Sequence, residues 1–321
     1  MAAQVLLAGV VALLDLQAAS PCGANRNTSA EVHSYLGRGQ WSTDPVGKLL
    51  RKLGRDVICD HAADTPGTWH SQNGQDKRVY RSLDDMKHGF FADLASNKPV
   101  TFSNTRTLER DHGWRGLCID GHVGMIAELA TRRTCKVIEA IVSHTADEPV
   151  TFRRFHGNWK SSELHAMSGI VAKGMANGLN NKTCWGKGAG GGTGWPCVSL
   201  SNTRGAVQDN GVTATLEAIL DRFGAPPTID YLSLDVEGAE EAVLVRFPFA
   251  RYRFRIMSIE RPSHKLAKVL EGNGYRYLCD NGQYGDQLWM NHLTFEKEAP
   301  ESLRERFRNK GGNIKKPSAC S

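Results

Sequence analysis

The chain has 321 residues, of which 40% are hydrophobic, and its formal net charge is +6. This length and composition suffice for one α/β domain with a full core plus extensions, and they exclude a wholly disordered chain. Much of the positive charge lies in a basic C-terminal tail, residues 298–321, which we interpret as a solvated chain end. Phe307 is the one aromatic residue of the tail, so the tail lacks a repeated pattern of aromatic and basic residues, and nucleic acid is not expected as a partner.

Residues 1–22 have the pattern of a signal peptide. An apolar run over residues 5–14 precedes small residues at 18–20, and it is too short to span a bilayer, so no stable membrane span is expected. The pattern predicts a protein of the secretory pathway or the extracellular space, with the cytoplasm as the alternative. In the secretory pathway, the sequons beginning at Asn27 and Asn181 would make it a glycoprotein.

Residues 23–76 form a polar N-terminal extension with too few large apolar residues for a core of its own. From residue 77, apolar strands and amphipathic helices alternate, which is typical of an α/β sheet. The predicted elements are a helix at 46–53, a strand from 89 to Asp93, a helix at 105–111, a strand at 116–120, a helix at 123–131, and strands at 135–142 and 150–155.

The first two strands of this alternation end in acidic residues, Asp93 and Asp120. Ligands of open α/β sheets bind outside the carboxyl ends of parallel strands, so these acids are candidates for a binding crevice. An acid at the end of the second strand can accept hydrogen bonds from both ribose hydroxyls of a nucleoside. The alternative is that Asp120 only caps the helix that follows it.

A long insertion, residues 157–210, interrupts the alternation. The glycine-rich stretch between Cys184 and Cys197 contains Gly-x-Gly-x-x-Gly, but it neither follows an apolar strand nor opens a helix, so it does not indicate a nucleotide-binding loop. We predict a flexible loop closed by a Cys184–Cys197 disulfide. Alternatively, Trp185 and Trp195 could form a lid that stacks on a sugar or a cofactor.

Eight cysteines are more than a cytosolic enzyme of this length needs. Cys118 and Cys135 fall on neighbouring predicted strands and could meet, but we expect buried free thiols there. Cys22, Cys59, Cys279 and Cys320 receive no assignment. The close Cys-x-x-Cys spacing of a zinc site is absent from the sequence.

The pattern resumes beyond the insertion. The predicted elements are a helix at 212–223, a strand from 229 to Asp235, a helix at 239–245, a strand at 254–260, a helix at 263–270, and strands at 276–279 and 287–294. If the strand ending at Glu260 lies beside the strand ending at Asp235, then Asp235, Glu237 and Glu260 form a cluster at the rim of the sheet. Glu240 and Glu241 fall in the first turn of the intervening helix, where we interpret them as structural.

Such a cluster suits removal of a proton from a hydroxyl group, because crowding of buried acids raises at least one pKa. We predict Asp235 or Glu237 as the general base or acceptor-orienting group, assisted by Glu260. The fallback bases are His144, His264 and His292. Carboxylates also bind Mg²⁺ or Ca²⁺, but the sequence shows no full ligand set, so no metal site is assigned.

Five segments together resemble the FkbM family of S-adenosylmethionine-dependent methyltransferases. They are residues 90–97 (FFADLASN), 103–105 (SNT), 108–110 (LER), 113–120 (GWRGLCID) and 230–240 (DYLSLDVEGAE). The resemblance implies a class I methyltransferase fold, a Rossmann-like doubly wound sheet, over residues 77–297. It also implies S-adenosylmethionine as the cofactor and transfer of its methyl group to a hydroxyl of a carbohydrate or secondary metabolite. It predicts no oligomeric state.

The resemblance also assigns cofactor-binding residues: Asp93, Ala95, Asn97, Ser103, Asn104, Asp120, Ala140 and Ile141. The chain departs from the family pattern at Ala95 and Pro99, which stand at glycine positions, and at Asp120 and Gly121, which stand where Glu and Pro are common. A secreted, non-catalytic carbohydrate-binding relative that has lost the cofactor is therefore an alternative. A dinucleotide-dependent oxidoreductase is disfavoured because no glycine triplet follows the first strand.

Overall fold

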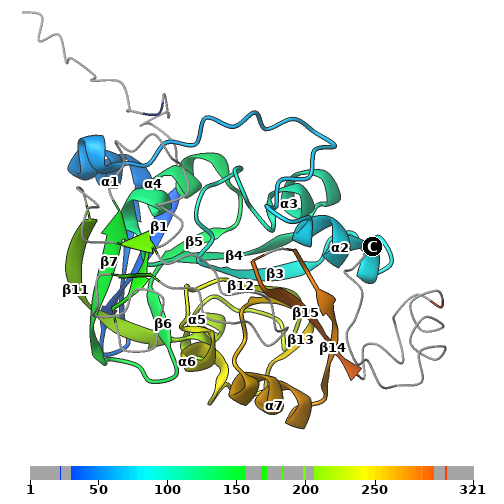
Figure 1. Ribbon diagram of the computed structural model, residues 1–321. Coiled ribbons are helices and arrows are strands. Elements are labelled where there is room, and N and C mark those ends of the chain that lie inside the picture. The colour runs from blue at the N-terminus through cyan, green and yellow to red at the C-terminus, as the bar shows by residue number, and fades with distance from the viewer. Residues whose placement is uncertain are drawn as a thin grey trace, which may run out of the picture.

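The computed structural model describes residues 22, 30–155, 168–171, 182–183, 198–199, 206–282, 284–292 and 301. Its largest element is a nine-stranded sheet with helices on both faces (Figure 1). In spatial order the strands are β14 (Tyr275–Asp280), β15 (Asp286–Asn291), β13 (Arg253–Glu260), β12 (Thr228–Leu234), β3 (Phe90–Leu94), β4 (Arg115–Asp120), β5 (Lys136–Glu139), β1 (Glu31–Gly37) and β2 (Gln40–Pro45). The chain thus has the mixed α/β architecture that the alternating sequence predicted.

The direction in which the chain crosses the sheet reverses beside β3. The chain proceeds from β3 through β4 to β5 on one side, whereas β12 pairs with the other edge of β3 and β13 follows outward. These strands are parallel, and antiparallel partners lie only at the two ends, as β15 and β14 and as β2. Such a reversal leaves a crevice outside the carboxyl ends of the two central strands, here β3 and β12.

The helices divide between the two faces of this sheet (Figure 1). One face carries α1 (Val46–Leu53), η1 (Gly54–Asp56), α2 (Gln75–Ser82), α3 (Arg106–His112) and α4 (Val123–Arg132), and the other carries α5 (Leu216–Arg222), α6 (Glu240–Leu244) and α7 (His264–Gly272). Successive strand residues feed opposite cores, so Phe91 packs with α1–α4 and Ala92 packs with α5–α7. None of the described helices is long and apolar enough to cross a membrane.

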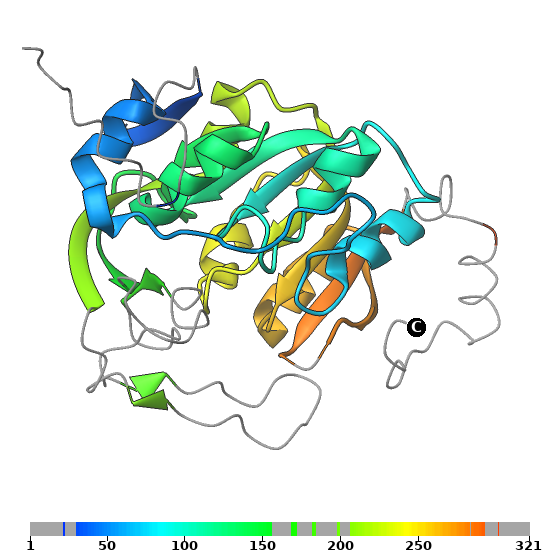
Figure 2. The same cartoon turned by 90° about the horizontal axis from the view of Figure 1, so that it is seen from above.

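The N-terminal extension joins the sheet directly. Its β1 pairs in parallel with β5, and β2 forms the edge beside it (Figures 1 and 2). The helix predicted at 46–53 is confirmed as α1, which buries Val46 and Leu50 completely. The β1–β2 hairpin was not predicted, because Val32 is its one buried large apolar residue and its remaining residues give little hydrophobic signal.

A second, four-stranded sheet stands beside the first at the end where β1 and β2 lie (Figure 2). Its order is β6 (Ile141–Ser143), β11 (Ala206–Thr215), β7 (Pro149–Phe155) and β8 (Gly169–Ile170), and a further pair consists of β9 (Lys182–Thr183) and β10 (Val198–Ser199). The prediction of a helix over 212–223 was wrong at its start. Residues 212–215 pair as part of β11, and α5 begins at Leu216. The single strand predicted at 135–142 is divided into two. Its first part, β5, pairs with β4, and its second part, β6, pairs with β11 of the second sheet.

Cysteine pairing corrects another expectation. Cys118 and Cys135 are not free thiols but form a disulfide, with Cα atoms 5.9 Å apart. The parallel pairing of β4 with β5 brings the two residues within ordinary disulfide reach. Cys22 and Cys59 form a second disulfide, and Cys279 is also disulfide-bonded. The predicted Cys184–Cys197 pair, the tryptophan lid and the acceptor asparagines of both sequons, Asn27 and Asn181, lie outside the described residues.

Candidate functional site

Two adjoining pockets occupy the crevice at the carboxyl ends of β3 and β12. Ala95, Asn97 and Asp235 line both of them, so the pockets form one continuous depression. Ala95 and Asn97 follow β3, and Asp235 follows β12. The change of direction in the sheet therefore places the site where the sequence predicted a crevice.

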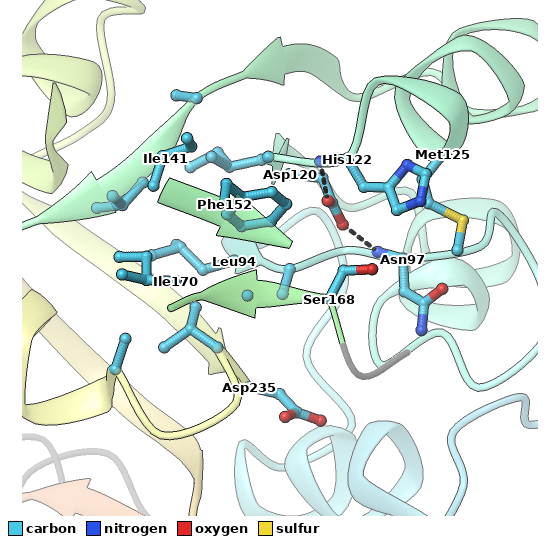
Figure 3. A pocket seen from close by; sticks show the side chains of 18 residues that line it. Leu94, Asn97, Asp120, His122, Met125, Ile141, Phe152, Ser168, Ile170 and Asp235 are labelled. Carbon is cyan, nitrogen blue, oxygen red and sulfur yellow. Dashed lines mark hydrogen bonds between the residues drawn. The ribbon is translucent and has the colours of Figure 1, made fainter. Parts of the chain in front are cut away.

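The first pocket is largely apolar (Figure 3). Its apolar lining consists of Leu94, Ala95, Ile119, Met125, Ala140, Ile141, Val142, Phe152, Ile170, Val236 and Ala239. Asp120 lies in its wall and accepts hydrogen bonds from the backbone N–H groups of His122 at 2.7 Å and Asn97 at 2.9 Å. Burial raises the pKa of Asp120 to about 6. The N-cap of α4 is His122, whose side chain accepts a hydrogen bond from Gly124 N–H, so the capping role that was the alternative for Asp120 belongs to His122.

The second pocket is polar. Its lining is Gln72, Gln75, Asp93, Ala95, Ser96, Asn97, Phe102, Asn104 and Asp235. Asp93 is buried and accepts a hydrogen bond of 2.6 Å from Thr105 Oγ1, and burial raises its pKa. Three oxygen atoms of the lining, Asn97 Oδ1, Asn104 Oδ1 and Asp235 Oδ1, are inaccessible to solvent and accept no hydrogen bond. Because unpaired buried acceptors are costly, this pocket suits a ligand group that donates several hydrogen bonds.

A carboxylate cluster lies behind Asp235 and contains the predicted Glu237 and Glu260. Arg261 donates hydrogen bonds to both glutamates, at 3.0 Å to Glu237 Oε2. Burial and the charge of Asp235 raise the pKa of Glu237 to about 8, against the opposing effect of Arg261. Burial, the charges of Asp235 and Glu237, and a hydrogen bond with Asp235 raise the pKa of Glu260. The three predicted catalytic acids therefore come together, although of these only Asp235 lines the pockets.

Two further acids belong to the cluster and were not predicted to act there. Glu240 accepts hydrogen bonds from the backbone N–H groups of Val236 and Gly238, both at 3.1 Å, so it holds the turn that follows Asp235. Asp286, at the start of β15, accepts a hydrogen bond from Asn73. Burial raises the pKa of Glu240 and that of Asp286 to about 7 each. The sequence carries no local signal for Asp286, because this residue reaches the cluster only through the antiparallel register that sets it opposite Glu260.

Oxygen atoms of Asp235, Glu240 and Glu260 lie within 4.8 Å of one another, so these three residues could hold a cation such as Mg²⁺ or Ca²⁺. Two of the three are buried, and Arg261 already pairs with Glu260. A divalent cation would therefore compete with the guanidinium group for that carboxylate.

Other predicted residues lie away from the pockets. Ser103 is buried at the start of α3, where its Oγ accepts hydrogen bonds from Arg106 N–H and from Arg133 Nη1, both at 3.1 Å. Pro99, a departure from the family pattern, lines neither pocket. The histidines named as fallback bases, His144, His264 and His292, line neither pocket.

Comparison with known proteins gives one match. The model of the methyltransferase FkbM domain matches residues 179–277, which include β12, β13 and the acids from Asp235 to Glu260. This confirms the FkbM resemblance for that part of the chain, whereas β3 and β4, with Asp93 and Asp120, lie before the match. A search of curated proteins and a search of solved structures each found no match.

Proposed function

We propose that this chain, which matches the FkbM methyltransferase domain over residues 179–277, is an S-adenosylmethionine-dependent O-methyltransferase. Its acceptor would be a hydroxyl group of a carbohydrate or secondary metabolite. The observation that carries the proposal is the single crevice whose walls contain both Asp120, at the end of β4, and Asp235, after β12. The first acid suits a nucleoside and the second suits the reacting hydroxyl.

The sheet supports a class I, doubly wound assignment. Strands β3, β4 and β5 lie on one side of the reversal point, and β12 and β13 lie on the other. Helices cover both faces, as in other doubly wound nucleotide-binding sheets. On this proposal, the β1–β2 hairpin and the second sheet are additions to the central fold.

The lining of the crevice fits the parts of S-adenosylmethionine. The apolar pocket suits the adenine base, and Asp120 can accept hydrogen bonds from the ribose hydroxyls. The amino-acid end carries an ammonium group, which can donate to the unpaired oxygens of Asn97 and Asn104. Of the predicted cofactor residues, only Ser103 lines neither pocket, so our proposal gives it no contact with the cofactor.

Bound S-adenosylmethionine supplies a methyl group activated by the positive charge on sulfur. The task of this chain is to align the acceptor and take its proton. Asp235 is the acid that reaches the crevice, so its carboxylate would accept the hydroxyl proton. Glu237 and Glu260 lie behind Asp235, and Arg261 pairs with both glutamates and so fixes the side of the cluster that faces away from the crevice.

Calorimetric titration with S-adenosylmethionine and S-adenosylhomocysteine tests cofactor binding. We expect the wild type to bind both and Asp120→Ala to bind about 10- to 100-fold more weakly, because a charged acceptor of the ribose hydroxyls is lost. Asp44→Ala removes an exposed acid that pairs with Lys48, and it should bind like the wild type. A folded wild type that binds neither compound contradicts the proposal.

Turnover tests the proposed base. With an acceptor found by screening sugars first, Asp235→Asn should lower kcat by about 10²- to 10⁴-fold, because the amide cannot take the proton. Glu241→Gln is the matched control, since Glu241 is bound to Ser263 and Lys265 outside the crevice. Equal kcat values for Asp235→Asn and the wild type would remove Asp235 from this role.

The second candidate is a secreted, non-catalytic carbohydrate-binding relative. It is favoured by Ala95 and Pro99, which stand where the family has glycine. Absence of cofactor binding together with glycan binding by the same preparation would establish it.

We further propose that the protein acts in the secretory pathway or outside the cell. The disulfide Cys118–Cys135, which lies beyond the predicted signal peptide, supports an oxidising compartment. Mass spectrometry of protein from secreting cells should find the signal peptide removed and a glycan on Asn27. Retention of an unprocessed chain in the cytoplasm would contradict this assignment.

A further inference from the structure

The roof of the apolar pocket does not come from the nine-stranded sheet. Phe152 lies on β7 and Ile170 on β8, two strands of the second sheet that pair at these residues. Figure 3 shows the Phe152 ring between Ile141 and Asp120, on the side of the pocket where Asp120 accepts its hydrogen bonds. The second sheet therefore contributes an aromatic face to a pocket whose floor is built by β3, β4 and the segment after β5.

The ring is packed closely against Gly121. A Cβ atom on Gly121 would lie 2.9 Å from Phe152 Cζ and 3.0 Å from Cε2, both shorter than normal contacts. The backbone of Gly121 does not require a positive φ, so its conformation is open to other residues. The absence of a side chain at this position is thus explained by the space that the ring takes, directly after Asp120.

The position of the ring is fixed before any ligand arrives. Phe152 is 8% exposed and packs with Ile170 and Ala239, with Ile141 and Val236 against the same cluster. A side chain held in this way loses little conformational freedom when a ligand stacks on it. A planar base is the ligand group that gains most from a fixed aromatic face.

We propose that Phe152 is a specificity-determining residue that stacks on the base of a purine nucleoside whose ribose is held by Asp120. This inference rests on the proposed function, since it names the part of the chain that reads the nucleoside. The second sheet is then part of the binding site and not only a surface addition.

Titration of S-adenosylhomocysteine and of adenosine separates this inference from the proposed function. Phe152→Ala should weaken binding of both compounds by about 10- to 100-fold, the range found when an aromatic partner of a stacked base is removed. Phe152→Tyr should bind like the wild type, and Phe152→Leu, which keeps apolar volume without a ring, should bind like Phe152→Ala. The control is Val150→Ala, because Val150 is on the same strand and in the same cluster but does not line the pocket.

A second variant keeps the test decisive if Phe152→Ala does not fold. Gly121→Ala places a methyl group against the ring and should weaken adenosine binding, whereas the same change in a Phe152→Leu background should have a smaller effect. If Gly121→Ala weakens adenosine binding equally in both backgrounds, the contact between the ring and the base is disproved. It is also disproved if a folded Phe152→Ala variant binds adenosine as tightly as the wild type or more tightly. If the wild type binds S-adenosylhomocysteine but Phe152 variants are unaffected, only this inference fails. If the wild type binds neither compound, both fail.

Discussion

Ala95 illustrates at the scale of one residue how the crevice is formed. Its φ is 58° and that of Asn97 is 55°, so the chain passes through the left-handed region twice directly after β3. Glycine adopts this region without steric cost, whereas a residue with a Cβ pays roughly 1–2 kcal/mol. Alanine at position 95, where the family has glycine, therefore lowers the stability of this turn. The turn still forms because the rest of the fold is stable enough to offset the loss.

Replacement of Ala95 by glycine should raise the free energy of unfolding by about 1 kcal/mol, because it removes that steric cost. Denaturant unfolding followed by circular dichroism measures it. The control is Ala218→Gly, at an exposed position of α5, which should lower the free energy of unfolding by about 0.5–1 kcal/mol. A loss of stability in both variants would show that Ala95 is not strained.

The acids that could be predicted from sequence are those at strand ends. Asp93, Asp120 and Asp235 each terminate an apolar run, and the carboxyl ends of parallel strands meet at one edge. Asp286 could not be predicted, because it begins a strand and reaches the same edge only through antiparallel pairing with β13. Phe152 was predicted as a strand residue, but its place over Asp120 depends on a sheet that the sequence did not reveal.

At the scale of elements, the disulfide between Cys118 and Cys135 fastens β4 to the start of β5. The bond closes a loop with a sequence separation of 17 residues. Closing a loop of this size in the unfolded chain is worth about 3 kcal/mol in the chain-entropy model. The bond lies in the strand that ends at Asp120, so it stabilises an element of the crevice wall.

The free energy of unfolding of the double variant Cys118→Ala/Cys135→Ala should therefore be about 2–4 kcal/mol lower than that of the oxidised wild type. Urea unfolding of both proteins measures the difference. Repeating it in reductant provides the control, because both chains then lack this crosslink and the difference should fall towards the small cost of lost packing. A difference that is the same with and without reductant would assign the effect to packing alone.

The elements best predicted were those whose pattern is local. Helix α1 was located to the residue, and α3, α4 and α7 were located within one or two residues. The end of β11 was missed because its β-branched residues next to α5 were assigned to the helix, and only pairing with β6 and β7 decides between the two. Strand pairing over long sequence distances is the information that local periodicity lacks.

At the scale of the whole molecule, the buried acids make folding sensitive to pH. The pKa of Asp286 is raised from 3.8 to about 7, so above pH 4 the unfolded chain releases this proton more readily than the folded chain does. The contribution of Asp286 to stability is thus greatest below its unfolded pKa and falls as pH rises from about 4 to 7. The raised pKa values of Glu237 and Glu240 act in the same direction.

The variant Asp286→Asn should be more stable than the wild type by about 1–3 kcal/mol at pH 8, with a smaller gain at pH 5, because it removes an ionisation that burial opposes. The asparagine keeps an oxygen that can accept the hydrogen bond from Asn73. Chemical unfolding at the two pH values measures the gain. Asp221→Asn, at an exposed position paired with Arg251, should show no such pH-dependent gain. An increase in the free energy of unfolding that is equal at pH 5 and pH 8 would show that ionisation of Asp286 does not cause the pH dependence.

The order of strands also has a consequence for synthesis of the chain. β3 has two sheet neighbours, β4 and β12, and β12 leaves the ribosome only after the whole second sheet has been made. Until then one edge of a buried central strand is unpaired, which is the kind of edge that recruits other nascent chains into aggregates. The strand that finally covers it is the one that delivers Asp235. Protection of this edge and completion of the crevice therefore happen in the same step of folding.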